Sequence, residues 1–284
     1  MRAYVPEYDL VAPGDLSEVL RLAGDGWRPL AGATDLGVLF ESDKLPYRKL
    51  VSLRAIPELA GIAVTDAHVT LGALVTYSEI RRHPVLAAEF PLLVRAASWT
   101  GAVATQNRGT LAGNIANGSP AADSPPALLV YDAELELLSA NGSRWVPYDA
   151  FHTGYKTNQM AANEIIGHIR LPRRTSGCSQ YLRKAGTRRA QAISKVALAG
   201  LAEIADGTVK HIRIALASVA PVPLRCLETE RWLMGRSINP AVIAEAKAKI
   251  AAEIAPIDDI RSTAEYRRRV SANLLGEFLE GLIQ

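Results

Sequence analysis

Residues 106–123 read QNRGTLAGNIANGSPAAD, and this segment decides the fold. Three of its residues are glycine, three are asparagine, and no charged side chain lies between Arg108 and Asp123. So small and polar a segment cannot fill a hydrophobic core, but its backbone N–H groups and short side chains can face an anionic group such as a pyrophosphate. A glycine-rich segment taken alone is often only a turn, so the interpretation depends on what accompanies it. We call this segment loop 2.

A second segment of small residues lies upstream, where residues 31–37 read AGATDLG. This segment, loop 1, follows an apolar stretch that ends at Leu30, and its Thr34 and Asp35 supply an acceptor and a candidate helix N-cap. Taken alone, it suits equally well a loop that merely precedes residues 36–40. Neither loop is followed by Gly-Lys-Ser/Thr or contains Gly-x-Gly-x-x-Gly, so a phosphate bound here is not bound by a P-loop or a Rossmann fold.

The composition is that of an ordinary globular protein. The chain has 284 residues, enough for two or three packed units, and 49% of them are hydrophobic and 21% charged. The net charge of +3 is small. The densest basic run, residues 267–269, lies in a helix-like segment, and we interpret it as a solvated helix face. No nucleic-acid partner is therefore expected.

The two cysteines and five histidines show no ligand spacing. Cys178 and Cys226 lie far apart, which excludes an iron–sulfur cluster or zinc site held by this chain alone and indicates a reducing compartment. The first residues have no apolar signal-peptide core, and no apolar run is long enough to span a bilayer. We expect a cytoplasmic protein with no membrane contact.

Hydrophobic periodicity predicts an α+β protein. Helices are expected at residues 15–24, 77–82, 85–98 and 241–255, and strands at residues 27–31, 50–53, 68–73 and 165–170. Hairpins are expected around Asn141-Gly142 and Asp206-Gly207, and a linker at residues 173–177. We expect a first domain at 1–175, divided into a small α/β subdomain (1–55) and a larger α+β subdomain (56–175), and a second domain at 176–284.

A third segment, residues 184–194, reads KAGTRRAQAIS. With loops 1 and 2 it resembles, in order and spacing, the FAD-binding medium subunits of the molybdenum hydroxylases, a family that includes xanthine dehydrogenase and carbon monoxide dehydrogenase. The resemblance covers nearly the whole chain. It implies a two-subdomain FAD-binding fold of the vanillyl-alcohol-oxidase/PCMH type, followed by a small α+β domain with an antiparallel sheet and helices. Loop 1 and the FHTGYK of residues 151–156 are closer to the xanthine dehydrogenase branch.

The resemblance implies that the FAD pyrophosphate lies between the two loops. On one side, the backbone N–H groups would come from Ala31, Gly32, Ala33, Thr34, Asp35 and Leu36. The other side and the ribityl chain would be held by Thr110, Gly113, Asn114, Asn117, Ser119 and Asp123. Ile165 or Ile166 would lie beside the isoalloxazine, and Lys184 would reach its pyrimidine edge, where a cation stabilises negative charge on the ring. From the sequence alone, Lys184 suits a surface lysine equally well.

Loop 1 departs from many of the sequences it resembles, which have glycine where this chain has Ala33. If position 33 needs a positive φ, alanine there costs about 1 kcal/mol or more. Either its φ is ordinary or the loop differs slightly. The chain also lacks the cysteine-bearing insertion of the hydroxybenzoyl-CoA reductase relatives, so no additional cluster is expected.

The resemblance also implies a function as the electron outlet of a complex. A molybdenum-binding large subunit would oxidise the substrate, and a small subunit with [2Fe–2S] clusters would pass electrons to FAD. NAD⁺ or another acceptor would then receive them, and this chain would need no catalytic side chain or metal of its own. Two alternatives remain at this stage: a self-sufficient flavin oxidase and a nucleotide-binding scaffold without redox activity.

Overall fold

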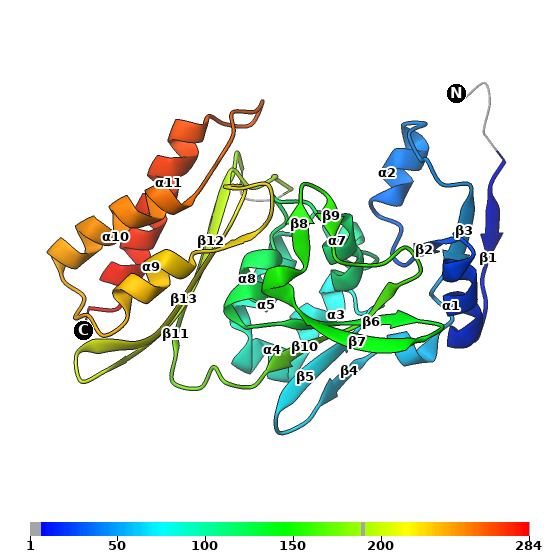
Figure 1. Ribbon diagram of the computed structural model, residues 1–284, viewed down its shortest axis with the longest axis horizontal. Coiled ribbons are helices and arrows are strands. Elements are labelled where there is room, and N and C mark those ends of the chain that lie inside the picture. The colour runs from blue at the N-terminus through cyan, green and yellow to red at the C-terminus, as the bar shows by residue number, and fades with distance from the viewer. Residues whose placement is uncertain (1–6, 189–190, 284) are drawn as a thin grey trace.

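A computed structural model describes residues 7–188 and 191–283, and it contains helices and strands in comparable amounts. Figure 1 shows a small N-terminal unit, a central unit and a C-terminal unit placed along the longest axis of the molecule. The α+β class is confirmed. In the described part of the chain, no helix combines the length and apolar character needed to cross a membrane.

The N-terminal unit is a three-stranded parallel sheet in the order β1-β3-β2. Its elements are β1 (Asp9–Val11), α1 (Leu16–Gly24), β2 (Arg28–Leu30), α2 (Leu36–Glu41) and β3 (Lys49–Ser52). Helix α1 begins where the Asp15 side chain accepts a hydrogen bond from the N–H of Ser17 at 2.9 Å, as its sequence predicts. Loop 1 leaves the carboxyl end of β2, the end of a parallel strand at which α/β sheets bind ligands.

The central unit is a five-stranded antiparallel sheet in the order β4-β5-β10-β6-β7, with helices around it. Its strands are β4 (Ile62–Val64), β5 (His68–Gly72), β6 (Glu134–Ser139), β7 (Gly142–Pro147) and β10 (Ile165–Pro172). A two-stranded sheet is formed by β8 (His152–Gly154) and β9 (Thr157–Asn158). The hairpin predicted at Asn141-Gly142 is confirmed, since β6 and β7 pair from Glu134–Pro147 to Ser139–Gly142.

Six α-helices belong to the central unit, and two short 3₁₀ turns lie at Pro57–Leu59 and Tyr148–Ala150. They are α3 (Tyr77–Arg82), α4 (Pro84–Glu89), α5 (Pro91–Trp99), α6 (Val103–Gln106), α7 (Leu111–Asn117) and α8 (Pro125–Val130). The single helix predicted at 85–98 is wrong in one respect, because the chain breaks at Phe90 (φ −126°, ψ 49°). Pro91 disfavours the helical conformation of the residue before it, so a new helix begins there.

The C-terminal unit is an antiparallel sheet in the order β11-β12-β13-β14, with three helices on one face (Figure 1). Helices α5 and α8 of the central unit pack against its other face. Its elements are β11 (Ser179–Ala185), β12 (Val196–Ala205), β13 (Thr208–Ala217), β14 (Leu224–Arg225), α9 (Leu227–Leu233), α10 (Pro240–Glu253) and α11 (Ala264–Glu280). The hairpin at Asp206-Gly207 and the cap of α10 by Asn239 are confirmed.

The interpretation of residues 267–269 as a solvated face is wrong for Arg267, whose side chain is buried. Its Nη1 donates to the carbonyls of Ser218 (2.8 Å) and Lys195 (3.0 Å), and its Nη2 to Asp259 (2.7 Å). Arg268 and Arg269 are exposed, as predicted. Successive helical residues point about 100° apart, so neighbouring arginines on α11 face different surroundings.

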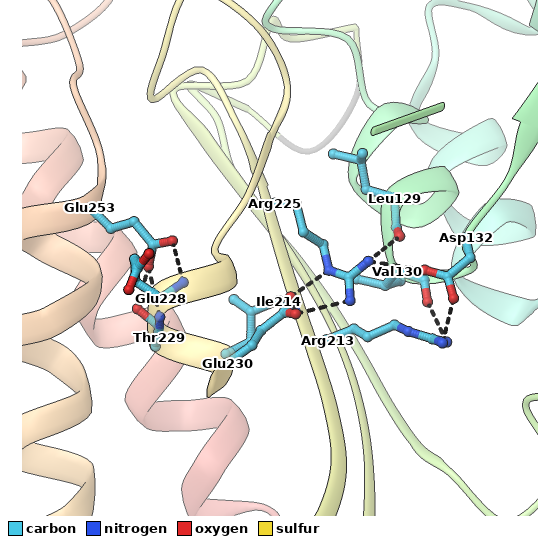
Figure 2. Close-up of polar contacts among 10 residues, drawn as sticks. All are labelled: Leu129, Val130, Asp132, Arg213, Ile214, Arg225, Glu228, Thr229, Glu230 and Glu253. Atoms are coloured by element: carbon cyan, nitrogen blue, oxygen red, sulfur yellow. Dashed lines mark hydrogen bonds and ion pairs between the residues drawn. The ribbon is translucent and has the colours of Figure 1, made fainter. Parts of the chain in front are cut away.

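Two arginines of the C-terminal sheet bind the carboxyl end of α8 (Figure 2). Arg225 Nη1 donates to the Leu129 carbonyl and Arg213 Nη1 to the Val130 carbonyl, both at 3.3 Å, and both arginines pair with Asp132. Arg225 also forms two hydrogen bonds with the buried carboxylate of Glu230. Cations stabilise the negative end of a helix dipole. We call Arg213, Arg225, Asp132 and Glu230 the α8 latch.

Substitution of Arg225 by leucine is expected to be strongly destabilising. It would leave Glu230, whose side chain is only 8% exposed, without its cation, a loss of about 3–5 kcal/mol in the free energy of unfolding. Arg231→Leu is the matched control, because the Arg231–Glu228 pair is 68% and 71% exposed and contributes about 0–1 kcal/mol. Urea unfolding of both variants measures the difference. Equal losses would contradict a buried latch.

Candidate functional site

Loops 1 and 2 meet at the boundary between the N-terminal and central units. An ideal Cβ built on Gly32 would lie 2.0 Å from the carbonyl oxygen of Arg108, far inside contact distance. A second contact joins the loops where Asn117 Nδ2 donates to Asp35 Oδ1 at 3.3 Å. The close approach at Gly32 is possible only without a side chain. The structure therefore brings together the two segments that the sequence singled out.

Hydrogen bonds within loop 2, and between loop 2 and the start of α3, fix its conformation. Thr110 caps α7, where its Oγ1 accepts from the N–H of Gly113 at 3.1 Å, and its backbone pairs with Thr76 at the start of α3. The helix ends at Gly118, whose φ of +65° favours glycine. Asn114 Oδ1 is buried and has no hydrogen-bond partner among the described residues, which leaves an acceptor for a ligand.

Loop 1 contains a strained alanine. Ala33 has a φ of +61°, so of the two possibilities open from the sequence, the left-handed conformation is the one observed. Alanine costs about 1 kcal/mol or more there, and strained residues cluster at functional sites. Asp35 makes no side-chain cap on α2, and its carboxylate contacts Asn117 instead.

A cavity of about 360 Å³ opens where the loops meet. Ala31, Gly32 and Thr110 line it, together with Arg54 and Arg108. In residues 7–188 and 191–283, neither arginine forms an ion pair, and guanidinium groups match the oxygens of a phosphate. Neither arginine was among the residues predicted for the site, although Arg108 lies within loop 2.

Another cavity, of about 340 Å³, lies at the opposite end of β5 and β10, where His68 and Pro172 line it. These two residues pair in the sheet, at the far end of β5 from Thr76 and loop 2. The cavity is not in contact with loop 1 or loop 2. Of these two cavities, the one at Gly32 is therefore the one that is lined by residues of the predicted site.

Lys184, Asp123 and Ser194 form a buried cluster at the other end of loop 2. Lys184 Nζ lies 2.7 Å from Asp123 Oδ2, and Ser194 Oγ donates to Asp123 Oδ1 at 2.7 Å. The Lys184 and Asp123 side chains are each 10% exposed, so Lys184 is not a surface lysine. Burial raises the pKa of the Asp123 carboxyl, and Lys184 and Ser194 oppose this effect. Asp123 and Lys184 were predicted to contact different parts of FAD, whereas in the structure they form one ion pair.

Ile165 and Ile166 are buried at the start of β10. Because β10 runs antiparallel to β5, they lie near the end of β5 from which the chain leads to Thr76 and loop 2. Helix α7 packs against β10. The two isoleucines are therefore at the loop 2 end of the central sheet. Ser119, also predicted for the site, accepts a hydrogen bond from the N–H of Ala121 within loop 2.

Comparison with known families identifies this architecture. Residues 6–174 match the FAD binding domain in molybdopterin dehydrogenase, and residues 181–282 match the CO dehydrogenase flavoprotein C-terminal domain. The chain belongs to the FAD-binding subunits of the molybdenum hydroxylases. The predicted family and its two-part fold are confirmed, and FAD is the cofactor of the N-terminal part. Among the described residues, no group of three or more His, Cys, Asp or Glu could hold a metal ion.

The sequences of individual relatives align with this chain over nearly its whole length. The carbon monoxide dehydrogenase medium chain of Hydrogenophaga pseudoflava is 29% identical over 276 residues, 95% of each chain. The putative xanthine dehydrogenase FAD-binding subunit XdhB of Escherichia coli is 28% identical over 258 residues, 89% of this chain and 88% of its own. These values do not separate the two branches, so closeness to the xanthine dehydrogenase branch stays a prediction.

A solved structure shows the same fold. Carbon monoxide dehydrogenase from Hydrogenophaga pseudoflava, in a form that lacks the Mo-pyranopterin moiety, contains a chain that superposes with a TM-score of 0.93. The match covers 98% of this chain and 97% of that chain, at 29% identity.

Gly32→Ala should separate the loops and weaken FAD binding, because its Cβ would overlap the Arg108 carbonyl. We expect FAD affinity to fall by about tenfold or more, which corresponds to about 1.4 kcal/mol. Gly37→Ala is the matched control, since a Cβ on Gly37 has nothing within 4 Å. Flavin retention on gel filtration compares the two. Equal retention would contradict the role given to the close approach.

Proposed function

We propose that this chain is the electron-transfer subunit of a molybdenum hydroxylase complex, which takes electrons from [2Fe–2S] clusters of a partner and passes them to NAD⁺ or another acceptor. The observation that carries the proposal is that loop 2 contacts loop 1 at one end, through Gly32, and the buried pair of Lys184 and Asp123 lies at its other end. FAD supplies the exchange of electrons when it is bound. The residues of this chain bind, orient and shield it.

The partners follow from what this chain lacks. It has two cysteines, too few to ligate a [2Fe–2S] cluster, so the clusters belong to another chain. Its relatives include medium chains and a subunit of the 6-hydroxypseudooxynicotine dehydrogenase complex of Paenarthrobacter nicotinovorans, names that imply further subunits. We propose a large molybdenum-binding subunit and a small iron–sulfur subunit as the partners.

The site residues take complementary roles in this proposal. The backbone of residues 31–36 and of Thr110, Gly113 and Asn114 binds the pyrophosphate, and the guanidinium groups of Arg54 and Arg108, which line the same cavity, neutralise it. Asn117, Ser119 and Asp123 face the ribityl chain. Buried Ile165 and Ile166 lie beside the isoalloxazine and keep water from it.

Lys184 and Asp123 together determine the charge at the pyrimidine edge. A lone cation there would stabilise the negative charge that the ring acquires on reduction. Asp123, 2.7 Å from Lys184, balances part of this charge. The pair therefore holds the flavin potential below the value that Lys184 alone would give it.

Native purification tests the proposed function. We expect a complex that contains this chain, a molybdenum subunit and an iron–sulfur subunit on native mass spectrometry, with one FAD for each copy of this chain. Stopped-flow mixing with NADH should then reduce the flavin. A native complex without FAD would refute the function, and a flavin that NADH does not reduce would exclude NAD⁺ as its acceptor.

Substitutions of the charged pair should shift the flavin potential in opposite directions. Lys184→Met removes the cation nearer the ring and should lower the midpoint potential, whereas Asp123→Asn removes its counter-ion and should raise it. We expect each shift to be about 30 mV or more, which corresponds to about 1.4 kcal/mol for two electrons. Lys210→Met, at the exposed Lys210–Asp206 pair, is the control. Shifts of the same sign would show that the Lys184–Asp123 pair does not act on the isoalloxazine ring through its charges.

A further inference from the structure

Ser194 is a member of the buried cluster for which the family resemblance implies no role. It lies between β11 and β12 and is fully buried. Its hydroxyl donates to Asp123 Oδ1 at 2.7 Å, while Asp123 Oδ2 lies 2.7 Å from Lys184 Nζ. Each oxygen of the Asp123 carboxylate therefore has its own partner, one neutral and one cationic.

The carbonyl of Ser194 is hydrogen-bonded to Ser218, which in turn is hydrogen-bonded to loop 2. Ser218 Oγ donates to the Ser194 carbonyl at 2.9 Å, and the N–H of Ser218 donates to the carbonyl of Pro120 in loop 2 at 2.8 Å. Ser218 has a φ of +67°, a conformation that persists only where the surroundings impose it. Arg267 supplies that constraint through its hydrogen bonds to the carbonyls of Ser218 and Lys195. The carbonyls of Ser194 and Lys195 are thus tied, through Ser218 and Arg267, to loop 2 and α11.

We propose that Ser194 is a positioning residue of the flavin site: its hydroxyl holds the Asp123 carboxylate as the counter-ion of Lys184, and so sets the charge presented to the flavin. The inference rests on the proposed function, because it assumes that the flavin lies at this cluster. Without the hydroxyl, Oδ1 of Asp123 is a buried acceptor with no partner. The carboxyl group then either turns away from Lys184 or takes up a proton.

The direction of the effect follows from the groups that face Asp123. These are Lys184 on β11 and Tyr77 on α3, whose phenol has a pKa raised by burial and so stays neutral. Ser194 is one of the groups that oppose the burial-driven rise in the pKa of Asp123, so its loss raises that pKa further. Below the new pKa, Asp123 is neutral and the charge of Lys184 is unbalanced. The flavin potential should be higher in that pH range.

Three variants distinguish a positioning role of the Ser194 hydroxyl from a role in protein stability alone. Ser194→Ala removes the hydroxyl, and Ser194→Thr keeps it. Thr229→Val is the matched control, because Thr229 is also fully buried and its hydroxyl also donates to a carboxylate, that of Glu253 at 2.6 Å (Figure 2). Glu253 is the last residue of α10 and accepts hydrogen bonds from the N–H groups of Glu228 and Thr229, the former in the first turn of α9. Its hydrogen-bond partners in the described part of the chain all lie in the C-terminal unit.

The first measurement needs no flavin. The Asp123 carboxyl is titrated by ¹³C NMR in the FAD-free protein, with Asp123→Asn used to assign its signal. In Ser194→Ala the titration should move to higher pH by about one to two units. Ser194→Thr should restore the wild-type titration, and Thr229→Val should not move it.

The second measurement is the midpoint potential of the FAD-loaded protein as a function of pH. In Ser194→Ala the inflection of this curve should move to higher pH by the same interval. An unchanged carboxyl titration, or a moved titration with an unchanged potential curve, overturns the inference while the proposed function stands. A wild-type protein that takes up no FAD, alone or in its native complex, overturns the proposed function itself.

Discussion

Loops 1 and 2 can touch only because residue 32 has no side chain. The backbone of Gly32 lies against the carbonyl of Arg108, where any Cβ would overlap it. This contact lies where the N-terminal unit meets the central unit, which α1 also joins by packing against β6. The cavity with Arg54 and Arg108, the strained φ of Ala33 and the contact of Asn117 with Asp35 all occur beside it. The shape of the N-terminal part of the proposed site therefore depends on the close approach of two backbone segments, at Gly32 and Arg108, and not on any single functional side chain.

The C-terminal part of the site depends on buried charge. Two arginines and one lysine of the C-terminal sheet reach into the central unit, and each meets a carboxylate there or next to it. Ion pairs that are largely removed from water tolerate little misalignment, since a lost partner leaves an uncompensated charge. This requirement fixes where the C-terminal sheet can sit. It also explains why Lys184, from another unit, lies so close to Asp123 of loop 2.

The resemblance of three segments was sufficient to predict the family, and local chemistry was sufficient to predict the turns and caps that act within a few residues. The turn at Asn141-Gly142 and the helix caps Asp15 and Asn239 act within a few residues, and their predictions are confirmed. The break before Pro91 was also readable, since proline restricts the residue before it. The φ of Ala33, the burial of Arg267 and the bond from Ser194 to Asp123 were not readable in this way. Each depends on a partner more than 60 residues away or on the face that a helix turns to its neighbours.

Helix α8 also determines how the C-terminal unit is attached. Asp123 lies two residues before its first residue and Asp132 two residues after its last, and each pairs with a cation of the C-terminal sheet, so the C-terminal unit is attached near both ends of the helix. Its six residues are about 9 Å long, which makes it a short, stiff rod. Between these two ends, Leu182 and Leu201 of the C-terminal sheet belong to the hydrophobic core of the central unit, and the Tyr131 hydroxyl donates to Gln180 of β11 at 2.6 Å. The C-terminal unit is therefore attached along the whole length of α8, and this short helix sets the distance between the latch and the flavin edge.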